Sequence, residues 1–307
     1  MKPRRLQDLT TERPNPVSAD LDLKSALEIA GIINAEDAKV AASVRRALPQ
    51  IARAIDLVAA HFRKGGRLLY VGTGTSGRIG ALDASEIPPT FATSPKLVQF
   101  LIAGGPKALG AEAEASEDSR ELGRAEMAKR KPTKKDVVIG IAASGRTPFT
   151  IAALEYARSR GAETIAVTCN PKSQLERGAH FAIVTDVGPE VLTGSSRMKA
   201  GTAQKMVLNM ITTGAMTRLG YVYGNLMVNL RLKNSKLSER GITILQNAAH
   251  VDRDMAHRCL QSAGNDVPLA LVMLKADVPR AQAARALHAT DGHVRKAIAL
   301  AQKSKRS

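Results

Sequence analysis

Apolar runs and helical patterns alternate through the middle of the chain. The run Leu68 to Val71 leads into a short loop and then an amphipathic segment, which we expect Pro88 and Pro89 to end. Strands that alternate with helices predict an α/β fold with a mostly parallel, five-stranded sheet flanked by helices. The other four predicted strands, each followed by a helical pattern, are Leu97 to Ala103, Val137 to Ile141, Thr164 to Thr168 and Phe181 to Thr185.

The segments on either side of this alternation are helical in pattern. Apolar residues between Leu21 and Phe62 recur with helical spacing and predict two or three helices, broken only locally near Pro49. Before them, the two prolines of TERPNP (residues 11–16) exclude a regular helix and favour an extended arm. Helical patterns also cover residues 199–219 and the chain from Ser238 onward. We therefore predict three parts: an N-terminal arm with helices (1–57), a sheet domain (58–221) and a small C-terminal helical bundle (222–307).

Composition and net charge limit the classes of protein to which this chain can belong. The 307 residues are 44% hydrophobic, enough for a sizeable core, and two cysteines are too few for a disulfide framework. A formal charge of +17 suits either a nucleic-acid binder or an enzyme for anionic substrates. Aromatic residues make up only 3% and tryptophan is absent, which argues against stacking on nucleic acid. Since no apolar run is long enough to span a membrane, we expect a cytoplasmic protein with no nucleic-acid or membrane partner.

Two loops at predicted strand ends share one chemistry. The first phosphate loop, Gly72 to Ser76, combines glycines with hydroxyl side chains directly before a helix, a pattern typical of phosphate binding. A tight turn without a ligand is the alternative. The second phosphate loop, Ala142 to Phe149, repeats the Ser-Gly-Arg sequence, and the carboxyl ends of parallel strands meet at one edge of a sheet. We expect both loops to bind one anion through five residues, namely Thr75, Ser76, Ser144, Arg146 and Thr147.

The pattern favours a sugar phosphate over a nucleotide. The first phosphate loop lacks the G-x-x-x-x-G-K-[ST] sequence that surrounds nucleotide phosphates in P-loop proteins. No distinctive acidic residue follows at the distance that a dinucleotide site requires.

Several stretches carry a resemblance to a known family. The hydroxyl-rich loops on a five-stranded sheet resemble the sugar isomerase (SIS) domain of phosphosugar proteins. Three stretches resemble the N-acetylmuramic acid 6-phosphate etherases more specifically: GTGTSGRIGALDASEIPPTF (72–91), GIAASGRTPF (140–149) and the long segment from EVLTGSSRMKAGTAQK onward (190–230). TERPNP (11–16) and AEASEDSRE (113–121) also match that family's pattern. One departure, Ile87 where a cysteine commonly precedes the two prolines, affects no residue with a proposed role.

The resemblance implies a reaction. Enzymes of this family cleave the D-lactyl ether of N-acetylmuramic acid 6-phosphate in amino sugar catabolism, giving N-acetylglucosamine 6-phosphate and D-lactate without metal or organic cofactor. In the ring-opened aldehyde the C2 proton is acidic, so a carboxylate can remove it and the lactyl oxygen can leave C3 by elimination. Water then adds to C3. Two carboxyl groups with different proton affinities suit these steps.

The same resemblance assigns the two carboxyl groups to Glu86 and Glu117, with Glu86 as the acid for the leaving lactate and Glu117 as the C2 base. Read without the family, Glu86 ends the helix that begins at the first phosphate loop, about two to three turns from the anion. The alternative for Glu86 is a solvent-exposed carboxylate at the end of a helix, with no part in the reaction. Glu117 stands in a charged stretch that by itself predicts an exposed helix face, so only the resemblance selects it.

A third segment completes the expected site. Ser195, Ser196 and Lys199 open a long helix and could bind the lactyl carboxylate. The alternative is a capped helix start with its basic residues on the solvent face.

Two other functions remain open from the sequence. A phosphosugar isomerase would share the phosphate loops and the C2 base but would need no group to expel an ether. A phosphosugar sensor resembling the glucokinase regulatory protein would need no catalytic carboxylates, although that protein is about twice as long. The paired glutamates favour the etherase, and since SIS domains commonly build their sites from two subunits, we expect a homodimer.

Overall fold

The computed structural model describes residues 9–110, 116–232 and 234–306, so residues 113–115 of the AEASEDSRE stretch lie outside the described part. The chain divides into two compact units, each described by itself below. The first comprises Met1–Ser85 and Pro95–Thr212, and the second comprises Glu86–Ser94 and Thr213–Ser307. The three-part division expected from the sequence stays a prediction.

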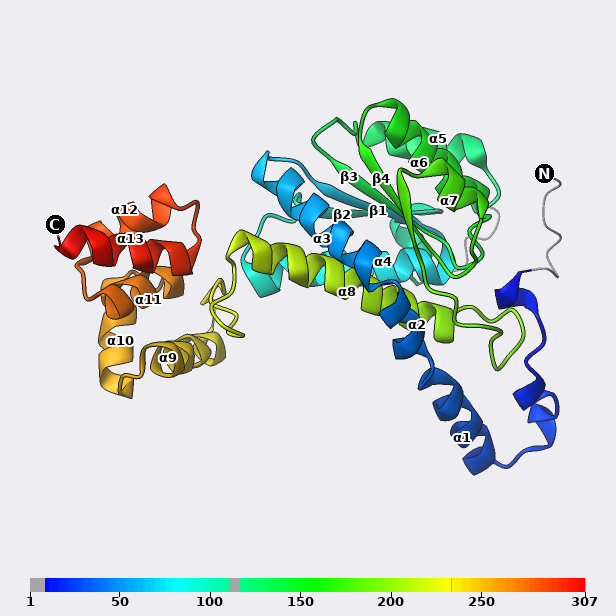
Figure 1. Ribbon diagram of the computed structural model, residues 1–307, viewed down its shortest axis with the longest axis horizontal. Coiled ribbons are helices and arrows are strands. Elements are labelled where there is room, and N and C mark those ends of the chain that lie inside the picture. Colours follow the sequence, from blue (N-terminus) through cyan, green and yellow to red (C-terminus); the bar gives the residue numbers. More distant parts are fainter. Residues whose placement is uncertain (1–8, 111–115, 233, 307) are drawn as a thin grey trace. The chain divides into compact units, whose positions relative to one another are not determined.

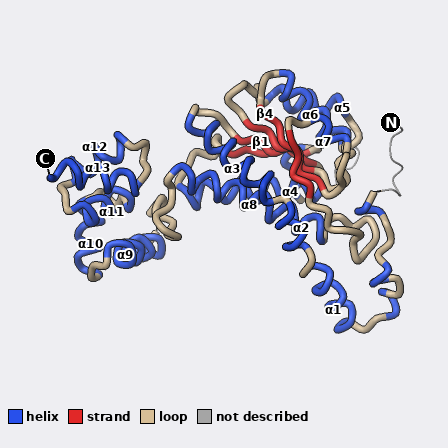
Figure 2. Tube along the Cα trace, in the orientation of Figure 1, coloured by secondary structure: helices blue, strands red, loops and turns tan. Residues whose placement is uncertain are grey.

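The first unit is built on one parallel sheet, drawn in red in Figure 2. Its strand order is β2-β1-β3-β4-β5, and every neighbouring pair is parallel. The predicted α/β fold is therefore confirmed, and the strand bounds fall within about two residues of the apolar runs. The strands are β1 (Leu68–Gly72), β2 (Val98–Ile102), β3 (Val137–Ile141), β4 (Glu163–Thr168) and β5 (Phe181–Val184).

Helices flank the sheet (Figure 1). The N-terminal helices are α1 (Ala26–Asp37), α2 (Val40–Arg46) and α3 (Leu48–Arg63). The helices between and after the strands are α4 (Gly74–Phe91), α5 (Arg120–Lys129), α6 (Pro148–Ser159), α7 (Gln174–Gly178) and α8 (Lys199–Leu219), and a 3-10 helix covers Gly105–Leu109.

Side chains of successive strand residues point to opposite faces of the sheet and pack on different helices. Leu69 and Val71 of β1 join the core that Phe149 and Leu154 of α6 help to form. Tyr70 points the other way, and its hydroxyl donates to the carboxylate of Asp83 on α4 (2.8 Å). Because both faces are buried, the strands read as continuous apolar runs, which is why the sequence locates them well.

Helix α4 corrects one expectation. It does not end at Pro88 and Pro89 but continues through both to Phe91. The φ of proline is compatible with a helix, and these prolines fall in the last turns, so they remove few backbone hydrogen bonds.

The N-terminal arm, Leu9–Ser18, has no α-helix, as its prolines predict. It contains two single-turn 3-10 helices, Thr10–Glu12 and Pro16–Ser18. A third, Leu21–Leu23, precedes α1, whose start is fixed by a capping box between Ser25 and Glu28. In Figure 1 the arm begins near the ends of the strands and then runs away from the sheet toward α1.

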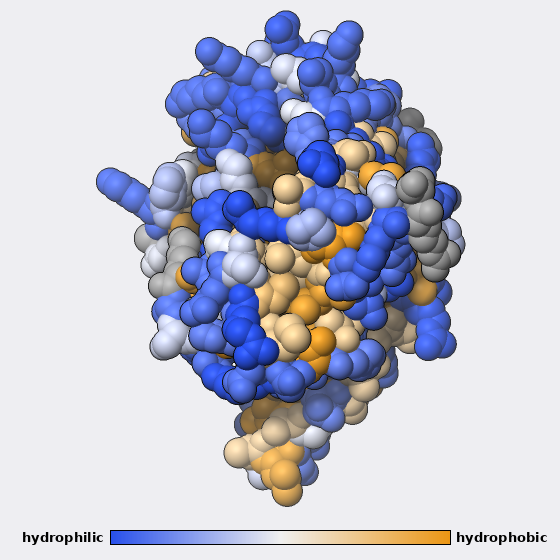
Figure 3. All heavy atoms as spheres, turned by 90° about the vertical axis from the view of Figure 1, so that its left-hand side faces the viewer, coloured by the Kyte–Doolittle hydropathy of each residue, from blue (hydrophilic) through white to orange (hydrophobic). Residues whose placement is uncertain are grey.

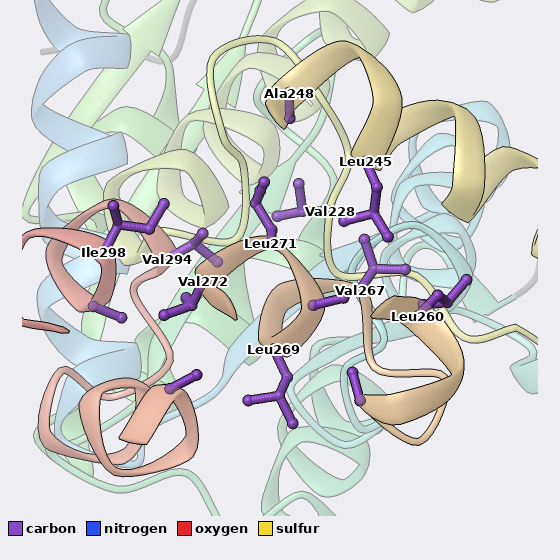
Figure 4. Packing of buried hydrophobic residues seen from close by; sticks show 14 of the residues in the cluster. Val228, Leu245, Ala248, Leu260, Val267, Leu269, Leu271, Val272, Val294 and Ile298 are labelled. Atoms are coloured by element: carbon purple, nitrogen blue, oxygen red, sulfur yellow. The ribbon is translucent and has the colours of Figure 1, made fainter. Parts of the chain in front are cut away.

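The second unit is a helical bundle with its own core. Buried side chains from successive helices meet in its centre, and Figure 4 shows ten of them labelled, including Leu245, Val267 and Ile298. Along the described chain, no helix is both long and apolar enough to cross a membrane. The helices are α9 (Ser235–Ala249), α10 (Arg253–Ser262), α11 (Val267–Ala276), α12 (Arg280–Ala289) and α13 (Val294–Arg306).

The surface is mostly hydrophilic but exposes some apolar side chains. On the face in Figure 3, hydrophilic residues (blue) surround a central group of hydrophobic ones (orange). In the N-terminal segment, Leu23 and Leu27 are 79% and 83% exposed. Leu23 precedes α1 and Leu27 lies in its first turn, so the start of this helix exposes two apolar side chains that its own chain leaves uncovered.

Candidate active site

The two phosphate loops leave neighbouring strands at the point where the strand order reverses. Strand β1 pairs with β2 on one side and β3 on the other, so chain connections diverge from it. Gly72 at the end of β1 lies in register with Ile141 at the end of β3. Ligands of parallel sheets bind outside the carboxyl ends of the strands at such a point. The structure thus brings the two loops side by side, as the sequence predicts.

The first phosphate loop turns directly into α4. Gly74 has a positive φ (+47°) and starts the helix, and Thr75 and Ser76 are half-buried in its first turn. The backbone N–H groups of a first helical turn have no partners within the helix, so they can donate to an anion. Gly77 approaches the sheet closely, because a Cβ on it would lie 2.6 Å from Ile102.

The second phosphate loop packs against the segment that follows β4. Gly145 has a φ of +66°, and a Cβ there would lie 2.4 Å from Ser173. Its carbonyl accepts from the N–H of Leu175 (3.0 Å). Thr147 precedes α6, but its hydroxyl does not cap that helix. Among the described residues, the buried Nη1 of Arg146 finds no hydrogen-bond partner. A buried donor left unpaired is costly, and a phosphate oxygen would satisfy it.

Glu117 lies between the two loops. A Cβ on Gly74 would be 3.1 Å from its Oε1, which places the carboxyl group against the start of α4. Its backbone carbonyl accepts from the N–H of Phe149 at the end of the second phosphate loop (3.0 Å). The side chain is half-buried rather than on an exposed helix face. A carboxylate is therefore held beside the position where both loops would bind the anion.

Ser195 and Ser196 lie in the turn before α8 and approach the first phosphate loop. The carbonyl of Ser196 accepts from the N–H of Gly201 (3.0 Å). A Cβ on Gly201 would contact both the Thr75 methyl (3.6 Å) and the Ser196 carbonyl (3.7 Å). This turn is thus the third segment at the same edge of the sheet.

Lys199 differs from both sequence-based alternatives. Its side chain is only 1% exposed, and its ammonium forms an ion pair with the buried Glu36 of α1 (2.5 Å). Lys39 and Asn15 also donate to Glu36. Lys199 is therefore neither on the solvent face nor presented to the loops, and its predicted contact with the lactyl carboxylate gains no support from this geometry.

The start of α8 is capped by a buried carboxylate that the sequence did not single out. Glu190 is 0% exposed and accepts from the backbone N–H groups of Lys199 and Ala200 (both 2.9 Å). Burial raises its pKa, although these bonds oppose the rise. Glu190 is the first residue of the segment 190–230 quoted above. Its position shortly before the start of a helix is the sequence feature from which its capping role could have been predicted.

Glu86 is exposed and lies on α4, in the second unit. One turn earlier on the helix, Asp83 is buried and accepts from Tyr70, Asn209 (2.7 Å) and Thr212 (3.1 Å). Burial raises the pKa of Asp83, against the effect of these hydrogen bonds. The network fixes α4 against β1 and α8, while the site built from the first unit contains Glu117 and not Glu86.

Comparisons with known proteins agree with the fold. A model described as the glucokinase regulatory protein N-terminal SIS domain matches residues 50–158, and a SIS domain model matches residues 125–214. The predicted SIS fold is confirmed.

Full-length relatives are more specific. The chain is 55% identical over 273 residues to the N-acetylmuramic acid 6-phosphate etherase of Symbiobacterium thermophilum, covering 89% of this chain and 91% of that one. It is 52% identical to the etherase of Salinibacter ruber (95% and 94% covered) and 48% identical to that of Klebsiella aerogenes (95% and 98% covered). The chain belongs to the N-acetylmuramic acid 6-phosphate etherase family, whose members are carbon–oxygen lyases.

Proposed function

We propose that this protein cleaves the D-lactyl ether of N-acetylmuramic acid 6-phosphate, giving N-acetylglucosamine 6-phosphate and D-lactate. The family relationship supports the reaction. The observation in this chain that carries the proposal is the position of Glu117, whose carboxyl group lies against Gly74 while its carbonyl accepts from Phe149. A carboxylate at a phosphate site suits proton removal from the bound sugar.

The phosphate binds at the edge of the sheet. Backbone N–H groups at the start of α4, with Thr75 and Ser76, donate from one side. Ser144, Arg146 and Thr147 donate from the other, and the unpaired Nη1 of Arg146 provides a charge-assisted bond.

The chemistry runs through two carboxyl groups. In the ring-opened aldehyde Glu117 takes the C2 proton, the C3–O bond breaks, and the acid Glu86 gives its proton to the lactyl oxygen. D-lactate leaves with the ether oxygen. Water then adds its oxygen to C3 of the unsaturated aldehyde as Glu86 accepts the water proton, and Glu117 returns a proton to C2.

Helix geometry supports a homodimer in which Glu86 acts on the partner's sugar. Thr75 and Glu86 are separated by eleven residues of α4, about three turns or ~16 Å along the axis. In a hexose 6-phosphate, C2 and C3 lie only a few bonds from the phosphorus. One helix can bring both residues to one sugar only if the extended substrate and both side chains together span that distance, so we expect Glu86 of a second copy to complete the site. The exposed Leu23 and Leu27 at the start of α1 offer apolar surface for a second copy.

Isotope labelling tests the reaction. In heavy-oxygen water, D-lactate should form unlabelled and the sugar product should carry one heavy oxygen on C3. In deuterated water, C2 should carry deuterium. Label in the lactate instead would mean cleavage on the other side of the ether oxygen and would refute the elimination. Conversion of a phosphosugar aldose to its ketose, with no lactate release, would favour an isomerase.

Variants test the assigned carboxylates. Glu117→Gln should bind substrate but lose most turnover and C2 exchange, because its amide cannot accept the proton, while Asp118→Asn, a change at the exposed neighbour, should retain both. Glu86→Gln should also lose turnover. A mixture of the two inactive variants should regain activity if each site uses Glu86 from one copy and Glu117 from the other. Full activity of either single variant would remove that residue from the mechanism.

Two expectations on the protein's surroundings stay proposals. We infer that it acts in the cytoplasm. We also infer that it binds no nucleic acid, because its positive charge is accompanied by few aromatic residues. If the protein leaves the electrophoretic mobility of duplex and single-stranded DNA unchanged, that result would support the absence of nucleic-acid binding.

A further inference from the structure

The N-terminal arm lies against the second phosphate loop, although about 130 residues separate them in sequence. Asn170, just after β4, joins the two. It is 1% exposed, and both ends of its side-chain amide are used. Its Oδ1 accepts from the backbone N–H (2.8 Å) and the hydroxyl (3.0 Å) of Thr10.

The other end of the amide reaches the loop. Nδ2 of Asn170 donates to the hydroxyl oxygen of Thr11 (3.1 Å) and to the carbonyl of Ala143 (3.0 Å). Ala143 directly precedes Ser144, which we assign to the phosphate. Four hydrogen bonds on one buried amide therefore connect Thr10 and Thr11 to the backbone of the loop, and we call this set of bonds the arm clasp.

The arm also contacts the third segment of the site. Asn15 donates to the carbonyl of Pro189 (3.2 Å), and Ser18 donates to the carbonyl of Val191 (2.7 Å). A Cβ on Gly194 would lie 3.3 Å from Oε2 of Glu12. The arm thus borders both the second phosphate loop and the turn that carries Ser195 and Ser196.

We propose that the arm is part of the substrate site's scaffold and that Asn170 is a positioning residue, which holds the second phosphate loop in its binding conformation only while the arm is seated. This rests on the proposed function, in which that loop binds the sugar phosphate. Nothing in the reaction requires Asn170 to touch the sugar. Its effect passes through the Ala143 carbonyl to the donors that follow it.

Reciprocity makes the proposal testable. If a seated arm favours the binding conformation of the loop, a bound sugar phosphate must favour the seated arm by the same factor. Product binding should therefore slow hydrogen exchange at the Thr10 amide, which donates to Asn170. A residue with only a structural role would show no such dependence on ligand.

The experiment compares five full-length proteins: the wild type, Asn170→Ala, Thr10→Val, Thr10→Ser and the control Thr217→Val. Thr217 is an exposed helical threonine of the second unit whose hydroxyl bonds only its own helix. The readouts are KM and kcat for N-acetylmuramic acid 6-phosphate, Kd for N-acetylglucosamine 6-phosphate, and exchange at arm amides with and without that product.

Asn170→Ala should raise KM and Kd about tenfold with kcat within about twofold, since several bonds are lost and none touches the reacting carbons. Thr10→Val should raise both about threefold, and Thr10→Ser should restore them. Product should slow arm exchange in the wild type and in Thr217→Val but not in Asn170→Ala. Thr10→Val alters a single half-buried hydroxyl, so it tests the clasp even if Asn170→Ala folds poorly.

Wild-type KM and Kd in Asn170→Ala, or arm exchange that product leaves unchanged in the wild type, would overturn the arm clasp while leaving the etherase reaction intact. A wild-type protein that does not bind N-acetylglucosamine 6-phosphate would instead refute the proposed function, and the clasp's role with it.

Discussion

Replacing Lys199 by methionine should destabilise the first unit by up to about 3 kcal/mol. The change keeps the volume but removes the ammonium that pairs with Glu36, a carboxylate that is only 3% exposed. Burial by itself would raise the pKa of Glu36, yet hydrogen bonds from Lys199, Lys39 and Asn15 lower it from 4.5 to about 2. At 1.36 kcal/mol per unit, that depression corresponds to about 3 kcal/mol of stability near neutral pH.

The sign of the pH dependence follows from the lowered pKa. Glu36 contributes its stability above its unfolded pKa, and the contribution is lost as pH falls from about 5 toward 2. Urea unfolding followed by far-UV circular dichroism should therefore show a gap of up to about 3 kcal/mol between wild type and Lys199→Met near pH 7, shrinking to about 1 kcal/mol or less near pH 3. Adding Glu36→Gln should recover most of the loss, because the uncompensated buried charge is gone.

Equal unfolding midpoints at neutral pH, or a gap that does not shrink in acid, would refute this account of the ion pair. The double variant Glu36→Gln/Lys199→Met also tests the role expected from the sequence. An unchanged KM in that protein would exclude Lys199 as a ligand of the lactyl carboxylate, whereas a KM raised tenfold or more would restore it.

Three further predictions concern glycines and a buried acid. Gly145→Ala should raise KM at least tenfold, because its Cβ would clash with Ser173 and displace the second phosphate loop. Gly188→Ala has a similar φ but open space, so it should lose only about 1 kcal/mol of stability and no affinity. Steady-state kinetics and thermal melts distinguish the two variants. Gly74→Ala should lower kcat more than it raises KM, since the added methyl displaces Glu117, and single-turnover kinetics checks this. Asp83→Ala should lower the free energy of unfolding by about 3 kcal/mol, measured by urea titration, because it leaves buried donors unpaired.

Local patterns were enough for the fold but not for the whole site. The strand at Val137–Ile141 and the helix at Lys199–Leu219 match their predicted bounds, since a buried strand is a continuous apolar run and a long helical segment is interrupted by no proline. The burial of Lys199 could not be predicted, because a lysine is exposed by default and its partner Glu36 lies 163 residues away. Its contact with the lactyl carboxylate stays a prediction.

Glu117 shows a second limit of prediction from the sequence. Its charged neighbourhood predicts an exposed helix face, and only the resemblance to the etherases selects it. Its place against Gly74 depends on a close approach between segments about 40 residues apart, which no periodicity encodes. Asn170 was missed for a similar reason, although its position directly after a strand at the ligand-binding edge was a usable signal.

The site that we propose at the sheet edge takes Gly74, Glu117, Ser144 and Ser196 from four distant stretches of one chain. An unfolded chain therefore has no residual affinity for the sugar, and ligand binding adds directly to the free energy of unfolding. At a ligand concentration of 100 times Kd the gain is about 2.7 kcal/mol. In a cell without the sugar phosphate the enzyme has its lowest free energy of unfolding. Its degradation by proteases is therefore fastest when its substrate is absent and slows when the substrate is present.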